Sequence, residues 1–164
     1  KYSDLYELTG FTEDAKSNGA KSSSIILKSE VRPASSTVAE FLQIEPGEDI
    51  FYLKRLRLYT GRIYGVFSTY ISMRFNLPLE PEQFDSETSL YDFYEQNGVK
   101  VTSASETIEA VMSTPEIRKE MFLDKDEPIF LRERITYNDL NVPIEYSKNH
   151  HRANQYKYVV RLHR

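Results

Sequence analysis

The run Ile50-Phe51-Tyr52-Leu53-Lys54-Arg55-Leu56-Arg57-Leu58-Tyr59 places two arginines inside an otherwise largely apolar stretch. Apolar and aromatic residues in such a run are typical of a β-strand. Because side chains alternate between the two faces of a strand, Arg55 and Arg57 should share one face, roughly 7 Å apart. Two interpretations fit this arrangement. The arginines either pair with carboxylates on an exposed sheet face, or they form a fixed cationic site for an anion.

The elements before and after this strand have clear signals of their own. The sequence from Ile63 to Met73 predicts a second strand, and Thr60-Gly61-Arg62 predicts the hairpin turn between the two. Upstream, the sequence from Ser22 to Val31 predicts a strand that ends at a proline. The capping-box spacing Thr37-Val38-Ala39-Glu40 predicts a short helix before the arginine strand. The polar lead-in of about twenty residues is expected to be a loop.

The second half repeats this order of elements. A helix is predicted from Ser89 to Asn97, with Ser89 as its N-cap. Thr114-Pro115 opens a further helix, whose apolar face is expected to be Ile117, Met121 and Phe122. Strands are predicted over Val99 to Met112, Pro128 to Tyr137, Val142 to Asn149 and Tyr156 to Leu162.

An internal repeat appears when the chain is compared with itself at an offset of 79 residues. Glu48, Ile50, Phe51 and Arg55 match Glu127, Ile129, Phe130 and Arg134. Arg57 falls opposite Thr136, so the arginine pair is expected in the first half alone. Two halves of this kind predict an α+β fold, in which an antiparallel sheet of about six strands carries flanking helices.

Composition limits the class of protein. The 164 residues suit one domain spanning 1–164, and zero cysteines exclude disulfides and thiol nucleophiles. We expect a soluble, cytoplasmic protein, because no stretch approaches the roughly 20 apolar residues needed to cross a membrane. The formal charge of −4 argues against direct contact with DNA, which normally needs a basic face.

A search for catalytic motifs finds no nucleophile elbow, phosphate loop or zinc-binding helix in the sequence. Adjacent His150 and His151 should point to opposite sheet faces, which disfavours a shared metal. We therefore predict no catalytic residues, no metal and no cofactor. Glu145 lies inside a strand, where it can pair with an arginine across the sheet or accept hydrogen bonds from a ligand's hydroxyl groups.

Several segments, in their order and spacing, carry a family resemblance. They are Gly10-Phe11-Thr12-Glu13-Asp14, Ala39-Glu40-Phe41-Leu42-Gln43-Ile44, Gly47-Glu48-Asp49-Ile50, the Arg55 to Leu58 stretch, Ser89-Leu90-Tyr91, Pro143-Ile144-Glu145-Tyr146-Ser147 and His151-Arg152-Ala153-Asn154-Gln155-Tyr156. Together they resemble the UTRA domain, the effector-binding module of GntR-type bacterial transcription regulators of the HutC subfamily. The likeness covers nearly the whole chain.

The resemblance implies a fold like chorismate lyase, a homodimer, and a small-molecule effector such as a phosphorylated sugar. DNA would be contacted only through an N-terminal winged helix, which we expect to be absent from this chain. In similar domains a phosphate is held by the arginine strand, a Gly-Phe-Thr loop and the serine at a helix start. The positions implied here for the ligand are Arg55, Arg57, Gly10, Phe11, Thr12, Ser89, Tyr91, Glu145 and His151.

Two departures from the family pattern bear on the ligand. Phe67 stands where a glutamate is common, and His151-Arg152-Ala153-Asn154 replaces a more usual Tyr-Arg-Gly-Asp. An aromatic ring in place of a carboxylate favours a less polar ligand body. Two alternatives stay open from the sequence, a chorismate lyase-like enzyme and a dimerisation module without a ligand.

Overall fold

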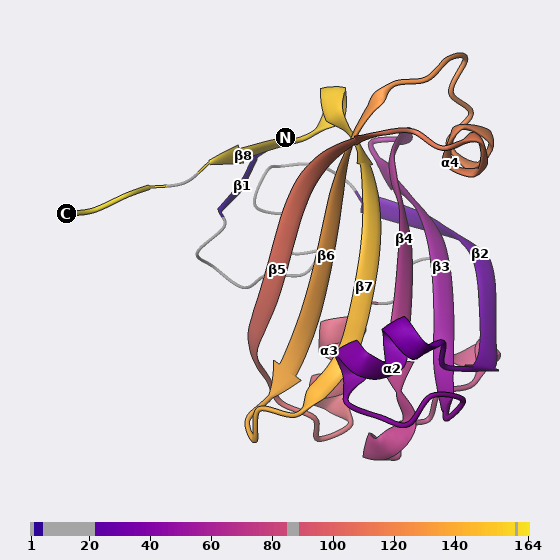
Figure 1. The fold of residues 1–164 in the computed structure, drawn as a ribbon, viewed down its shortest axis with the longest axis vertical. Coiled ribbons are helices and arrows are strands. Elements are labelled where there is room, and N and C mark those ends of the chain that lie inside the picture. The colour runs from indigo at the N-terminus through magenta and orange to yellow at the C-terminus, as the bar shows by residue number, and fades with distance from the viewer. Residues whose placement is uncertain (1, 5–21, 85–88, 160) are drawn as a thin grey trace.

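A six-stranded antiparallel sheet, with strand order β2-β3-β4-β7-β6-β5, forms the centre of the computed structural model (Figure 1). The structure describes residues 2–4, 22–84, 89–159 and 161–164. The strands are β2 (Ser22–Pro33), β3 (Asp49–Tyr59), β4 (Arg62–Ser72), β5 (Val101–Met112), β6 (Pro128–Asn138) and β7 (Pro143–Arg152). The predicted α+β class and the two hairpins, β3–β4 and β6–β7, are confirmed.

A separate parallel pair joins β1 (Tyr2–Asp4) to β8 (Lys157–Val159). Two predictions need correction here. The described part of the lead-in is a strand and not a loop, and the last strand is shorter than the predicted range from Tyr156 to Leu162 and lies outside the main sheet. Pairing between chain segments this far apart leaves no local pattern in the sequence.

The predicted repeat of elements is present in the sheet. β2, helix α2 (Ser36–Leu42) and the β3–β4 hairpin form one half. β5, helix α4 (Pro115–Glu120) and the β6–β7 hairpin form the other. Each half places its first strand at an edge of the sheet and its last strand at the centre, where β4 pairs with β7.

Side-chain caps set the starts of the helices. Ser35, and not the predicted Thr37, caps α2, because the Ser35 hydroxyl accepts a hydrogen bond from the Val38 N–H at 3.2 Å. Thr114 caps α4 and Ser89 caps α3 (Leu90–Gln96), as predicted. Short 3-10 turns complete the described elements: η1 (Met73–Phe75), η2 (Pro81–Gln83) and η3 (Ala153–Gln155).

The helices divide the sheet into two faces. Helices α2 and α4 pack on the face that carries Tyr52 and Leu56, here called the outer face and turned toward the viewer in Figure 1. Helix α3 packs on the opposite, inner face, against Phe51 and Leu53 of β3. Arg55 and Arg57 share the inner face with these two residues, because they follow them at steps of two along the strand.

Phe122 does not belong to the apolar face of α4, contrary to the prediction. It lies beyond the helix with a left-handed φ of 55° and 77% of its surface exposed. Gln43, its equivalent 79 residues earlier, has a φ of 56° after α2. The duplicated helix exit therefore imposes this backbone turn in both halves and carries the Phe122 side chain outward.

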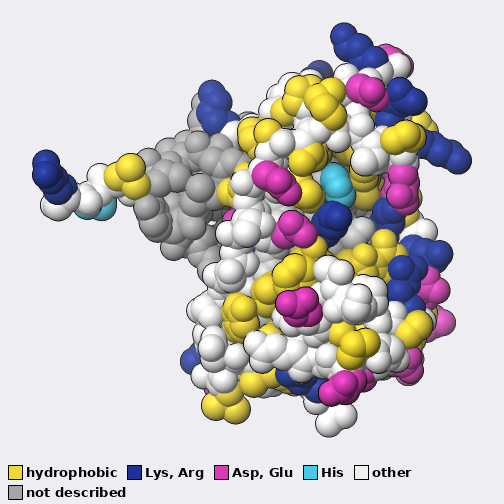
Figure 2. All heavy atoms as spheres, viewed as in Figure 1, with side chains coloured by type: hydrophobic (Ala, Val, Ile, Leu, Met, Phe, Trp, Pro, Cys, Tyr) yellow, Lys and Arg dark blue, Asp and Glu magenta, His cyan; other side chains and the backbone are white. Residues whose placement is uncertain are grey.

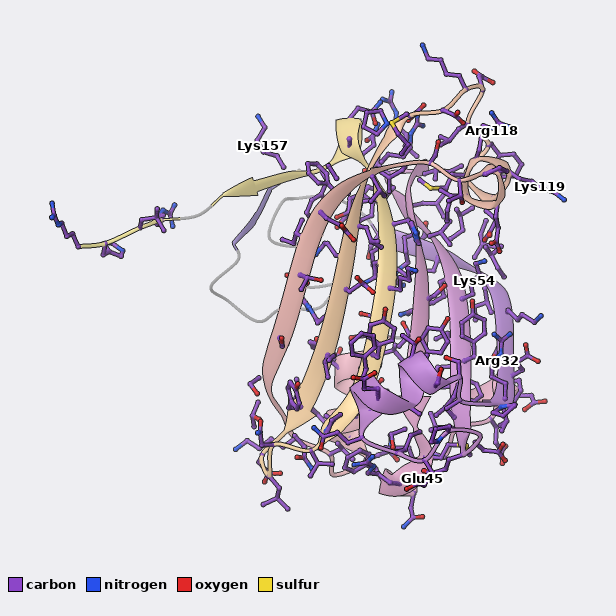
Figure 3. All side chains as sticks on the ribbon, viewed as in Figure 1. Arg32, Glu45, Lys54, Arg118, Lys119 and Lys157 are labelled. Atoms are coloured by element: carbon purple, nitrogen blue, oxygen red, sulfur yellow. The ribbon has the colours of Figure 1, made fainter. Side chains whose placement is uncertain are left out.

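Charges of both signs are interspersed on the side of the molecule that carries α2 and α4 (Figure 2). Lys54 of β3 lies on this side and bonds to Glu120 of α4 at 2.7 Å, while Arg118 and Lys119 point outward from α4 (Figure 3). None of the described helices has the length and apolar character required to cross a bilayer.

Candidate ligand-binding site

Arg55 and Arg57 lie buried on the inner face, with exposed fractions of 4% and 5%. The interpretation as exposed surface arginines is therefore wrong. Arg57 donates to the Ser24 hydroxyl of β2, and its guanidinium lies 5.1 Å from the ring centre of Phe67 on β4. Cross-strand pairing fixes this neighbourhood, since Ser24 is opposite Arg57 and Phe67 is opposite Arg55.

Burial makes both charges costly. Desolvation lowers the pKa of Arg55 to about 10, although the nearby Glu145 and Tyr94 favour its charged form. The pKa of Arg57 is lowered well below its usual value by desolvation and by the positive charge of Arg55. Two like charges held together away from water are stabilised by an anion placed between them.

Glu145 of β7 is a carboxylate whose negative charge acts on both Arg55 and Arg57. It is buried, and its Oε1 accepts a hydrogen bond from the Tyr94 hydroxyl of α3 at 2.8 Å. Burial raises the pKa of Glu145, whereas the Tyr94 hydrogen bond and the charge of Arg55 act to lower it. A buried carboxylate in this setting accepts hydrogen bonds from hydroxyl groups.

Helix α3 brings two of the predicted site residues to the inner face. Tyr91 shares a hydrogen bond of 3.1 Å with the Thr136 hydroxyl and accepts another of 3.1 Å from Arg134. Burial raises the pKa of Tyr91. Ser89 caps the helix, where its hydroxyl accepts from the Asp92 N–H at 3.5 Å. The start of α3 thus lies on the same side of the sheet as the arginines.

His151 is 1% exposed and lies on the inner face, opposite Gly65 of β4. Its ring contacts Tyr64, Phe67 and Tyr156, with centroid distances of 4.9, 4.9 and 4.8 Å. His150 points to the outer face, as strand alternation predicts. The three other predicted residues, Gly10, Phe11 and Thr12, lie outside the described residues.

The comparisons with known proteins agree with this architecture. The model of the UTRA domain family matches residues 17–157. The chain belongs to the UTRA family. The crystal structure of the effector domain of PhnF from Mycobacterium smegmatis superposes on this UTRA domain with a TM-score of 0.91, at 24% identity and with 100% of both chains covered. The expected fold is thereby confirmed.

Two curated relatives are transcriptional repressors. The UTRA domain is 27% identical over 156 residues to the HTH-type transcriptional repressor NagR of Bacillus subtilis, covering 94% of this chain and 63% of NagR. It is 26% identical over 158 residues to the mannosyl-D-glycerate transport/metabolism system repressor MngR of Escherichia coli, covering 96% of this chain and 65% of MngR. The chain thus spans less than two thirds of either relative.

Sequence reasoning missed a second arginine pair in this UTRA domain. Arg132 and Arg134 of β6 both face inward, and both donate to Oε1 of Glu106 on β5, at 2.8 to 3.1 Å. The expectation that only the first half carries an arginine pair is wrong. The spacing Arg132-Glu133-Arg134 was the available signal, but it lies two residues out of register with Arg55-Leu56-Arg57 in the repeat.

Both arginine pairs of the inner face lie under the influence of a carboxylate. Glu106 neutralises part of the charge of Arg132 and Arg134, and the Tyr156 hydroxyl accepts from Arg132 at 2.7 Å. Glu145, whose charge acts on Arg55 and Arg57, accepts a hydrogen bond from Tyr94.

A shallow depression of about 460 Å³ lies elsewhere, lined by Gln43, Ile44, Glu45, Glu48 and Arg74. Arg74 donates to the carbonyl oxygens of Leu42 and Gln43 at 2.6 and 3.0 Å. These bonds satisfy the free carbonyl groups at the end of α2, so helix capping explains the arginine. Among the described residues, no cluster of His, Asp or Glu is arranged to hold a metal ion.

Proposed function

We propose that this UTRA domain binds a small anionic metabolite, a sugar phosphate, on the inner face of its sheet. Binding would control an attached winged-helix domain that contacts DNA, with the protein acting as a homodimer. The observation that carries the proposal is the buried pair Arg55 and Arg57, held on one strand at 4% and 5% exposure. The pair lies within the segment that matches the UTRA family.

The chemistry of the pair suits a phosphate. Guanidinium groups present several N–H donors in a planar fork that matches phosphate or carboxylate oxygens. Both arginines have a lowered pKa through burial, so an incoming anion would compensate the cost of keeping them charged. In the proposed arrangement the phosphate is held by Arg55, Arg57, Gly10, Phe11, Thr12 and Ser89.

The rest of the ligand would extend across the sheet toward β7. Glu145 and Tyr91 supply polar atoms there, and aromatic rings surround the imidazole of His151. Phe67 adds a ring beside Arg57. This mixture of carboxylate, hydroxyl and ring fits a sugar, which offers both hydroxyl groups and apolar C–H faces.

One relative supports an anionic sugar as the class of ligand. MngR is the repressor of a mannosyl-D-glycerate transport/metabolism system, and this compound joins a sugar to a carboxylate. An anion joined to a sugar is what the arginine pair and Glu145 would bind together. Phosphate and carboxylate share the guanidinium-binding chemistry, so both belong in the test.

The test is calorimetric titration of the domain with sugar phosphates and sugar carboxylates. Arg57→Ala should weaken binding of the best ligand by about 1.5 to 3 kcal/mol, because it removes a charge-assisted contact. Arg118→Ala is the matched control, since Arg118 is a half-exposed arginine on α4 that pairs with Asp126 at the surface. Equal affinity of Arg57→Ala and the parent would refute the site.

The regulatory half of the proposal needs the full-length protein. Addition of the identified ligand should change its affinity for operator DNA, measured by fluorescence anisotropy. The Arg57→Ala protein should bind the same DNA but lose this response, because the coupling between the two sites depends on the ligand. A response that persists in Arg57→Ala would place the effector elsewhere.

A further inference from the structure

The hydrogen bond between Tyr94 and Glu145 joins helix α3 to the centre of the inner face. Tyr94 is fully buried and donates its hydroxyl to Oε1 of Glu145 at 2.8 Å, across 51 residues of sequence. Burial and the adjacent carboxylate raise the pKa of Tyr94 well above its usual value. The phenol therefore keeps its proton and acts as a hydrogen-bond donor to the carboxylate.

A second tyrosine of the same helix reinforces this position. Tyr91, one turn earlier on α3, bonds to Thr136, and Thr136 is the cross-strand partner of Glu145. The two phenol groups of α3 thus form hydrogen bonds to paired residues, Thr136 on β6 and Glu145 on β7. Helix α3 is therefore hydrogen-bonded to both strands beside Glu145.

The charges around Glu145 indicate what would happen without Tyr94. The positive groups that act on it are Arg55, Arg134 and Arg57, in decreasing order. Each of them attracts the carboxylate, and Arg55 lies on the β3 side where the anion is proposed to bind. Among the described residues, Tyr94 on α3 is the group that donates a hydrogen bond to Glu145.

We propose that Tyr94 is a positioning residue that makes the site selective for a hydroxylated ligand over a bare anion. By holding Oε1 of Glu145, Tyr94 directs the second carboxylate oxygen, Oε2, toward a hydroxyl group of the ligand. It also keeps Glu145 from competing with the ligand for Arg55. This inference rests on the proposed function, because it assigns the body of the ligand to the Glu145 side of the same site.

A core tyrosine that serves packing alone would give a different result. The Tyr94 ring packs with the rings of Tyr91 and Phe93, and Tyr94→Phe keeps this ring while removing only the hydroxyl. If packing were its sole role, Tyr94→Phe would change the affinity for every anion by the same factor. If Tyr94 positions Glu145, the loss of affinity should be larger for ligands that carry hydroxyl groups than for inorganic phosphate.

The experiment compares inorganic phosphate with glucose 6-phosphate, ribose 5-phosphate and glycerol 3-phosphate by calorimetry. In the parent, at least one hydroxylated phosphate should bind more tightly than inorganic phosphate. In Tyr94→Phe, the ratio of these two affinities should fall roughly tenfold, the value of one hydrogen bond to a charged group. Tyr70→Phe, on the outer face between Tyr52 and Tyr146, is the matched control and should keep the parent ratio.

A double-mutant cycle with Glu145→Gln tests whether Tyr94 acts through Glu145. Tyr94→Phe should cause no further loss of selectivity in the Glu145→Gln background. An unchanged ratio in Tyr94→Phe, additive losses in the cycle, or no preference of the parent for hydroxylated phosphates would each overturn the inference while leaving the anion site intact. Failure of the parent to bind these four anions, and likewise the sugar phosphates and sugar carboxylates of the calorimetric test above, would instead overturn the proposed function itself.

Discussion

At the residue scale, the inner face departs from what a sheet core normally contains. Arg55, Arg57, Arg132 and Glu145 are all buried, and isolated charges are costly away from water. Each gains from a specific partner or neighbour, such as Ser24 for Arg57 and Glu106 for Arg132. Charged residues that lower the stability of the fold but lie close together on one surface are typical of a binding site.

Gly65 shows how closely the two halves of the sheet approach each other. A Cβ atom on Gly65 would lie 2.3 Å from the His150 carbonyl oxygen, which is backbone and cannot rotate away. Gly65→Ala should therefore destabilise the domain by about 1 to 3 kcal/mol in urea unfolding, as overpacking in a rigid core does. Gly47→Asn is the control and should cost less than about 1 kcal/mol, because space is open there and asparagine tolerates positive φ.

His150 gives the domain a specific sensitivity to acid. Burial, with Lys148 and Lys54 nearby, lowers the pKa of His150 from 6.5 to about 4, while Glu116 and Glu133 act in the opposite direction. Between pH 6.5 and pH 4, His150 therefore binds a proton in the unfolded chain but not in the folded chain. Stability is therefore unaffected by His150 above pH 6.5 and falls as pH drops from 6.5 toward 4.

The measurement is urea unfolding at pH 7 and pH 4.5. His150→Asn should lose about 2 kcal/mol less stability than the parent over this interval, since it removes the suppressed protonation. His163→Asn, in the exposed tail, should follow the parent curve. Parallel curves for the parent and His150→Asn would contradict the assignment.

At the scale of elements, the two halves use the same device to start their helices. Ser35 caps α2 and Thr114 caps α4, each by accepting a backbone N–H at 3.2 Å, and the two positions are 79 residues apart. The repeat therefore extends to helix capping as well as to the order of the elements. Short helices depend on such caps and on packing, because they make few internal hydrogen bonds.

Ser35→Ala and Thr114→Ala should each reduce stability by about 1 kcal/mol. Hydrogen exchange should speed up mainly in the helix that loses its cap, α2 in the first case and α4 in the second. Ser36→Ala is the control, because Ser36 is exposed and its loss should cost less than about 0.5 kcal/mol. Faster exchange in both helices from one substitution would indicate that they open together.

At the scale of the whole molecule, the proposed site lies to one side of a duplicated frame. The second-half arginine pair is bonded to Glu106, whereas the first-half pair lies beside Ser24, Phe67 and the Tyr94-bound Glu145. Helix α3 lies between the halves in sequence and packs on the inner face. Helix α3 has no counterpart in the repeated order of the described elements, so the two halves differ in what surrounds the inner face.

A ligand that neutralises buried arginines should stabilise the whole domain. At a concentration 100 times its Kd, the best sugar phosphate should add about 2.7 kcal/mol to the free energy of unfolding, which is roughly 5 to 10 °C in Tm. The Arg55→Ala/Arg57→Ala double variant should show no such rise. Sodium chloride at equal ionic strength is the control, and an equal rise with this salt would indicate non-specific screening.

The elements themselves were largely predictable from the sequence. The alternation of Phe51, Leu53, Arg55 and Arg57, the glycine turn after Tyr59 and the Thr114-Pro115 start all act through neighbouring residues. Errors arose where two local signals competed, as at Ser35 against Thr37, or where a helix exit turned Phe122 outward. The family resemblance supplied the candidate ligand-binding residues, and their role in binding stays a prediction.

The sequence by itself determined the strands, the hairpins, the helix starts and the repeated order of elements, because backbone preference and side-chain periodicity act over a few residues. Only the tertiary structure decided that Arg55 and Arg57 are buried, that Arg132 and Arg134 meet Glu106, and that Tyr94 bonds to Glu145. These contacts depend on which strands are neighbours and which face a helix covers. They join residues 26 to 51 positions apart, beyond the reach of any local pattern.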